Sequence, residues 1–132
     1  KNFADIDIRL SKGSANTAKL KTIPSSYKIL YFFKNDCPAA LVQNVILSRY
    51  MSSKMLQIPV FTIFESNAQN TVNLLGRIKP EAFYYAEDKS IFKLARVKKA
   101  PFYILLNKDN KIKKKFKDIE KLKKYLEEKI NN

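Results

Sequence analysis

Two kinds of hydrophobic pattern alternate along the chain. Some runs are short, nearly continuous and rich in β-branched and aromatic residues, which is typical of strands covered on both faces of a sheet. Others place apolar residues three or four positions apart, which is typical of amphipathic helices. The continuous runs predict strands at 28–33, 58–64, 82–85 and 101–106, and the spaced runs predict helices at 38–54, 66–76, 87–97 and 118–130.

Further stretches with alternating or turn-forming residues predict two antiparallel hairpins. Near the start, residues 5–10 and 17–23 flank a turn-rich segment. Near the end, a turn at 107–111 leads into the lysine-rich run 112–116. Buried strands that alternate with helices require a mainly parallel α/β core, to which the terminal hairpin adds antiparallel strands. We therefore predict one α/β domain over residues 1–132, with a central mixed sheet flanked by helices.

The first and last predicted helices carry more detail. A proline such as Pro38 suits the first turn of a helix. Asp118 is the expected N-cap of the last helix, where Glu120 and Lys124 are expected to form an i,i+4 ion pair. In the first helix the residues at three- and four-residue spacing are Leu41, Val42, Val45, Ile46, Arg49 and Tyr50. The expected apolar face of the last helix is Ile119, Leu122, Leu126 and Ile130.

The charge balance is strongly basic, with 26 Lys and Arg against 12 Asp and Glu and a net charge of +14. A nucleic-acid or anionic-membrane surface is one interpretation, and a solvated lysine-rich surface is the simpler one, which we favour. Recognition of phosphates and bases favours arginine, of which the chain has four: Arg9, Arg49, Arg77 and Arg96. Lysines at 111–117 could form a surface for an acidic partner, but lysines on an edge strand also prevent unwanted strand pairing. We expect no nucleic-acid partner and no membrane span, since no apolar run reaches about 18 residues.

The chain has one cysteine, Cys37, and no histidine. This composition excludes a His/Cys zinc site and a disulfide within the chain. It also excludes Ser–His and Cys–His catalysis by this chain alone. We expect neither a metal nor a cofactor.

Cys37 lies between a predicted buried strand, 28–33, and the helix that begins at Pro38. Backbone N–H groups and the dipole at a helix N-terminus stabilise a thiolate, so we expect a lowered pKa for this thiol. The carboxyl edge of an α/β sheet is also where such folds usually place their sites. The alternative is a small buried hydrophobic residue, against which the polar residues 34–36 argue.

Three segments carry a resemblance to the thioredoxin superfamily, and to its TlpA/ResA-type (AhpC/TSA-related) branch of exported bacterial thiol–disulfide oxidoreductases. They are "LKTIPSSYKILYFFKNDCPAA" (20–40), "DKSIFKLARVKKAPFYILLNKDNKI" (88–112), and the N-terminal hairpin, which is similar to the extra strands of that branch. The resemblance implies a thioredoxin-like fold and a protein disulfide substrate or redox partner. It also implies an exported protein of the bacterial periplasm or envelope; the cytoplasm is the alternative. We expect a monomer.

The resemblance also assigns residues. Cys37 would be the nucleophile, with Pro38 and Ala39 beside it in the substrate groove. Pro101 would be a cis-proline that faces the thiol, and the backbone of Ala100 would pair with a bound substrate peptide. The alternative for Pro101 is an ordinary trans proline at the start of an edge strand.

The chain departs from the family pattern at Ala40, where the Cys-x-x-Cys motif has its second, resolving cysteine. Three explanations remain open: an engineered cysteine-to-alanine change, a natural single-thiol protein resolved by an external thiol, or a redox-inactive protein-binding module. A basic nucleic-acid-binding protein is a weaker alternative function. There are two further departures from the family pattern. Strand 28–33 has no acid that could accept a proton; Glu65 and Glu87 are candidates, but we favour a solvated surface role for each. Phe102 stands where relatives often have threonine or another small residue.

Overall fold

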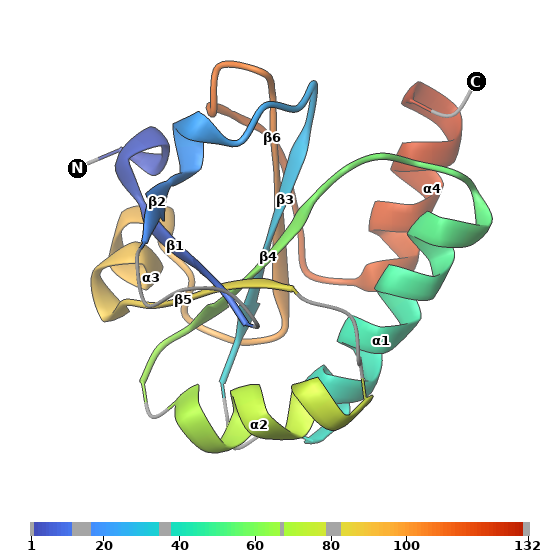
Figure 1. The fold of residues 1–132 in the computed structure, drawn as a ribbon. Coiled ribbons are helices and arrows are strands. Elements are labelled where there is room, and N and C mark those ends of the chain that lie inside the picture. Colours follow the sequence, from blue (N-terminus) through green and yellow to red (C-terminus); the bar gives the residue numbers. More distant parts are fainter. Residues whose placement is uncertain (1, 12–16, 35–37, 67, 79–82, 131–132) are drawn as a thin grey trace.

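The computed structural model describes residues 2–11, 17–34, 38–66, 68–78 and 83–130. Within these residues the strands form one mixed sheet in the order β2-β1-β5-β4-β3-β6-β7 (Figure 1). The strands are β1 (Asp7–Leu10), β2 (Ala18–Lys19), β3 (Lys28–Phe33), β4 (Val60–Phe64), β5 (Tyr84–Glu87), β6 (Phe102–Leu106) and β7 (Ile112–Phe116). The α-helices are α1 (Pro38–Ser53), α2 (Ala68–Ile78), α3 (Lys89–Ala95) and α4 (Ile119–Lys129), and short 3-10 helices lie at Phe3–Asp5 and Leu20–Thr22.

The centre of the sheet is parallel and its sides are antiparallel. Strands β3, β4 and β5 run parallel to one another. β6 pairs antiparallel with β3, and β7 with β6. On the other side, β1 pairs antiparallel with β5 and with β2. Both predicted hairpins are therefore present, although the second arm of the N-terminal hairpin is only two residues long.

Helices cover both faces of the sheet, which is why all six residues of β3 are buried. α1, α2 and α4 pack on one face, and α3 packs on the other together with the N-terminal segment (Figure 1). The helical side chains in the first core are Leu47, Met51, Val72, Leu75, Leu122 and Leu126. Those of α3 in the second core are Ile91, Phe92 and Ala95.

The predicted apolar face of α1 is only partly correct. Tyr50 packs against the hydrophobic core as expected, but two other residues of that face do not. Val42 and Ile46 are 58% and 41% exposed, whereas Leu47 and Met51 are buried against the sheet. The side chain of Leu41 lies outside the described residues. α1 carries apolar residues around most of its circumference, so their spacing alone could not determine which side faces the sheet.

Helix α4 matches its prediction at the cap and on its buried face, but not in its ion pair. Asp118 accepts a hydrogen bond from the Glu120 backbone at 2.7 Å. Glu120 pairs with Lys123 at 3.5 Å instead of Lys124, which pairs with Glu128 at 4.0 Å. Both i,i+3 and i,i+4 neighbours can meet on a helix surface, and the rotamers decide between them.

Candidate functional site

The carboxyl ends of the parallel strands and the start of β6 lie at the same edge of the sheet (Figure 1). Phe102, the first residue of β6, is the register partner of Phe32. Pro101 therefore lies level with Phe33, the last residue of β3. The chain continues from β3 toward α1, so the two segments singled out by the sequence converge at this edge.

Cys37, the predicted nucleophile, lies outside the described residues, together with residues 35 and 36. The backbone of Pro38, Ala39 and Ala40 forms the first turn of α1, and their side chains also lie outside the described part. The proline therefore opens the helix, as its fixed φ favours.

The loop between α3 and β6 carries the other predicted site residues. The Ala100–Pro101 peptide bond is cis. Both residues are partly exposed, so their backbone lies at the surface of the molecule beside the end of β3.

Two side-chain hydrogen bonds hold α1 against the sheet. The Tyr103 hydroxyl, on β6, donates to Gln43 Oε1 at 2.8 Å. Asn44 Nδ2 donates to Thr62 Oγ1 on β4 at 2.9 Å, and both residues are buried. The first bond connects the helix that follows Cys37 to the strand that follows Pro101. Sequence analysis missed both bonds, because polar residues within an amphipathic helix normally face water.

Tyr103 belongs to the hydrophobic core between α1 and the sheet. It is fully buried, and its ring stacks on that of Tyr31 with centroids 4.9 Å apart. Burial raises the pKa of Tyr103 well above its ordinary value of 10.0. The hydroxyl therefore remains a hydrogen-bond donor at any physiological pH.

The described part of the chain contains no buried carboxylate at this edge. Glu65, which follows β4, lies 4.0 Å from Lys34, which follows β3, and both side chains are about one-third exposed. Glu87 is exposed at the end of β5. The buried charged residue of β3, Lys28, lies at the opposite end of the strand, where burial lowers its pKa. No described acid is therefore placed as a desolvated proton acceptor.

A groove of about 630 Å³ opens beside Pro101. Val97, Ala100, Pro101 and Phe102 form its apolar lining, and its cationic lining residues are Arg96, Lys98, Lys99 and Lys117. All four cations are exposed, and no carboxylate lines the groove. The lysine-rich run 111–117 is evident in the sequence, but the sequence does not show that its last residue, Lys117, lies next to the proline loop.

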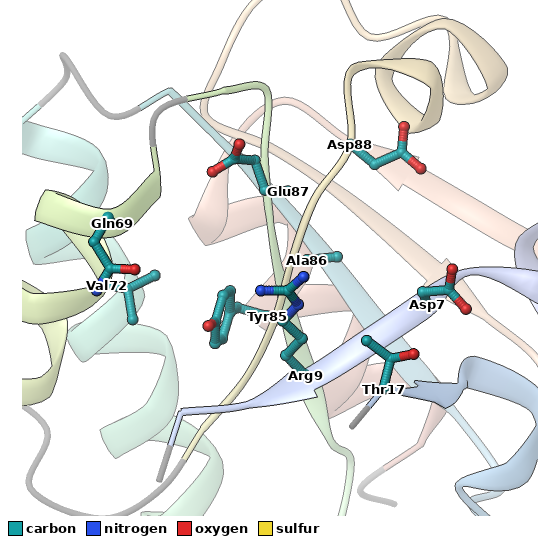
Figure 2. A pocket seen from close by; sticks show the side chains of 9 residues that line it. All are labelled: Asp7, Arg9, Thr17, Gln69, Val72, Tyr85, Ala86, Glu87 and Asp88. Carbon is teal, nitrogen blue, oxygen red and sulfur yellow. The ribbon is translucent and has the colours of Figure 1, made fainter. Parts of the chain in front are cut away.

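Two other cavities are not lined by the proline loop. One, of about 520 Å³, lies between β7 and α4 and is lined mainly by lysines. The other, of about 280 Å³, lies among β1, β5 and α2 (Figure 2). Figure 2 shows the Arg9 side chain crossing β5 toward the ring of Tyr85, while the carboxylate of Glu87 points away from it.

Two further kinds of site are absent from the described residues. No group of three or more Cys, Asp or Glu side chains there could hold a metal ion. None of the helices in the described ranges combines the length and the apolar character that crossing a bilayer requires.

Comparison with solved structures identifies the fold. No protein-family model matches the chain, and no curated protein matches it. The thioredoxin domain of a Bacteroides vulgatus thiol–disulfide oxidoreductase superposes with a TM-score of 0.71 at 14% identity, over 93% of this chain and 89% of that one. Thioredoxin from Wuchereria bancrofti superposes with a TM-score of 0.67 at 16% identity, over 95% and 96%. The chain has a thioredoxin-like fold.

A third neighbour with this fold is a secreted Mycobacterium tuberculosis disulfide oxidoreductase homologous to E. coli DsbE. Its TM-score is 0.66 at 12% identity, over 87% of this chain and 84% of that one. At such low identity these likenesses establish the thioredoxin-like fold alone. The mixed sheet with helices on both faces and the N-terminal hairpin agree with the fold that the sequence predicted.

Proposed function

We propose that this protein is a thiol–disulfide oxidoreductase of TlpA/ResA-like type, which attacks protein disulfides through Cys37. The observation that carries the proposal is the register between β3 and β6. It sets the Ala100–Pro101 loop level with the end of the strand that leads to Cys37. Two of the structural neighbours are themselves named as thiol–disulfide or disulfide oxidoreductases.

Helix α1 supplies the physical reason for reactivity. It begins at Pro38, directly after Cys37 in the chain. The first backbone N–H groups of a helix have no intrahelical acceptor, and the dipole is positive at that end. Both effects favour a thiolate over a thiol, and the thiolate is the nucleophile in disulfide exchange.

The reaction proceeds as two thiol–disulfide exchanges. The Cys37 thiolate attacks one sulfur of a substrate disulfide, a Cys37–substrate disulfide forms, and the other substrate sulfur leaves as a thiolate with the electron pair. Ala40 has no thiol with which to attack this mixed disulfide. An external thiol, which we assign as the co-reactant, therefore attacks the substrate sulfur. It forms a disulfide with the substrate and releases the Cys37 thiolate.

The remaining predicted residues shape the surface that meets the substrate. Pro38 and Ala39 lie at the start of α1, and Ala100 and Pro101 lie in the partly exposed loop before β6. The Ala100 backbone pairs with the substrate peptide on one side of its cysteine. We further propose that the protein acts as a monomer. We also propose that it is exported, in line with its M. tuberculosis neighbour, whose name describes that protein as secreted.

The test measures the reactivity of Cys37 in the folded and the urea-unfolded chain. Because Cys37 is the only thiol, alkylation by iodoacetamide and attack on 4,4′-dithiodipyridine report on it alone. We expect the folded protein to titrate below the ordinary thiol pKa of about 8.5 and to react faster than the unfolded chain near neutral pH. Cys37→Ser should abolish both signals. A folded-state pKa at or above about 8.5, with slower reaction than the unfolded chain, contradicts the proposal.

Ala40 specifically favours a second candidate, a redox-inactive module that binds a protein partner. This candidate predicts an unreactive Cys37 and partner binding that is unaffected by Cys37→Ser. The same reactivity measurement therefore separates the two functions.

A further inference from the structure

We propose that the groove beside Pro101 selects acidic segments, so that the preferred substrates carry Asp or Glu next to the disulfide that Cys37 attacks. This inference rests on the proposed function for the reaction. The preference itself follows from the charges and the shape of the groove.

The groove combines an apolar floor with a cationic rim. Val97 is 8% exposed and Phe102 packs against the core beneath it. Three lysines and one arginine surround this floor, and none of the lining residues is acidic. Within the described part of the chain, none of these four cations forms an ion pair. Their charges are therefore available to a ligand.

Hydrogen bonds in the surrounding turn fix the positions from which the cations extend. Arg96 caps α3 in the left-handed conformation, with φ of 58°. The Val97 N–H donates to the Phe92 carbonyl at 2.9 Å. Lys115 Nζ donates to the Ala95 carbonyl at 3.0 Å and so connects β7 to the end of α3. The backbone that carries the rim is therefore held in place by hydrogen bonds from α3 and from β7.

The sheet register brings the rim to the substrate surface. Phe116 of β7 is the register partner of Tyr103, so Lys117 lies level with the start of β6. Lys98 and Lys99 directly precede Ala100 in the chain. A peptide that pairs with the Ala100 backbone would have its flanking side chains within reach of these lysines, since a lysine carries its charge on a flexible four-carbon stem.

The composition of the groove favours a polypeptide over a nucleic acid. Arginine, which reads phosphates and bases with two parallel hydrogen bonds, provides only one of the four cations. The one aromatic side chain of the groove, Phe102, is partly buried against the core and cannot serve as a series of stacking platforms. Carboxylates of an extended acidic segment need only the point charges that lysines supply.

The experiment compares two peptides that differ only in charge. Each carries one cysteine activated as a 4-pyridyl disulfide, flanked either by Asp and Glu or by Asn and Gln. Attack by Cys37 joins the peptide to Cys37 and releases absorbing 4-thiopyridone. We expect the acidic peptide to react about fivefold faster at low salt, because two exposed ion pairs each contribute a factor of about two or more. The advantage should shrink at about 0.5 M salt.

Charge-neutralising variants localise the effect. Lys98→Gln/Lys99→Gln should remove most of the preference for the acidic peptide. The matched control Lys108→Gln/Lys111→Gln makes the same change in the exposed turn at the other end of β6 and should preserve it. Equal losses in both variants would show that only net charge matters and would overturn the inference.

Two further readouts complete the test. Uncharged 4,4′-dithiodipyridine measures the intrinsic reactivity of Cys37 in each variant, and each peptide rate is divided by it to isolate the charge preference. If this reagent does not react even with the parent protein, the proposed function has failed. If it reacts but the two peptides have the same rate, the acidic preference alone has failed. A thiol-free acidic peptide should slow the reaction of the acidic substrate more than oligo(dT) of equal charge. The reverse order would indicate a nucleic-acid groove and would refute the inference.

Discussion

The hydrogen bond between Tyr103 and Gln43 can be tested by Tyr103→Phe. This change removes one oxygen and retains the ring that stacks on Tyr31. It eliminates the 2.8 Å bond that connects β6 to α1 and the hydrogen bond between the Tyr103 and Tyr31 hydroxyls. Partly buried Gln43 can then bond to water, whereas Tyr31 is fully buried. A neutral hydrogen bond of this kind contributes about 1 kcal/mol to the free energy of unfolding. Because both bonds are lost, we expect Tyr103→Phe to be less stable by about 2 kcal/mol near neutral pH.

The same substitution should reverse its effect in alkali. Burial raises the pKa of Tyr103 above its unfolded value, so its protonated form stabilises the fold below about pH 10 and this stability is lost as pH rises toward the folded pKa. At about pH 11 the unfolded tyrosine is mostly ionised, and the parent protein loses about 1.4 kcal/mol that the phenylalanine variant keeps. The deficit of about 2 kcal/mol should therefore vanish at about pH 11.5, where the two stabilities cross.

Urea unfolding at several pH values, with a reductant to protect Cys37, measures this crossing. Burial and a hydrogen bond to Glu127 raise the pKa of Tyr50 to about 12. The contribution of Tyr50 to the free energy of unfolding therefore also falls as the pH rises. It does so equally in both proteins, so it cancels in the difference. Tyr125→Phe, on a partly exposed ring, is the matched control and should change stability by less than about 0.5 kcal/mol near neutral pH. A Tyr103→Phe deficit that stays constant from neutral to alkaline pH would refute the reasoning.

Two other substitutions test the site and its support. Ala40→Cys should supply the missing resolving thiol. Because the second attack then becomes intramolecular, turnover of a peptide disulfide with dithiothreitol should rise at least about tenfold. Unchanged turnover, with no disulfide between Cys37 and the introduced thiol in the oxidised protein, would contradict the proposed motif. Asn44→Ala should lower the free energy of unfolding by about 2 kcal/mol in urea titrations, since it removes a buried hydrogen bond to Thr62. A loss below about 0.5 kcal/mol would show that this bond does not hold α1 in place.

Much of the fold could be predicted from local pattern. The continuous apolar run at 28–33 became β3 with the same bounds, because a strand covered on both faces needs apolar residues at every position. Helix 38–54 was also found, but its buried face was predicted only in part. Asn44, a polar residue, faces the sheet while Val42 faces water, and only the packing partners decide that choice.

The candidate site, like the fold, could be predicted from the sequence only in part. Pro101 and Ala100 were singled out by resemblance, and the structure places their loop at the edge where β3 ends. The charges around the loop could not be assigned to it from the sequence. Lys117 is separated along the chain from Lys98 and Lys99, and it joins them only because the β6–β7 hairpin folds back.

By itself, the sequence determined the alternation of strands and helices, the N-cap of the last helix, and the presence of a single cysteine directly before the first helix. These are local properties, since they depend on residues close together in the chain. Only the tertiary structure decided which face of α1 is buried, which polar groups hold it, and which lysines surround the proline loop. Those outcomes depend on contacts between residues far apart in sequence, such as Gln43 and Tyr103, and hydrophobic periodicity carries no information about them.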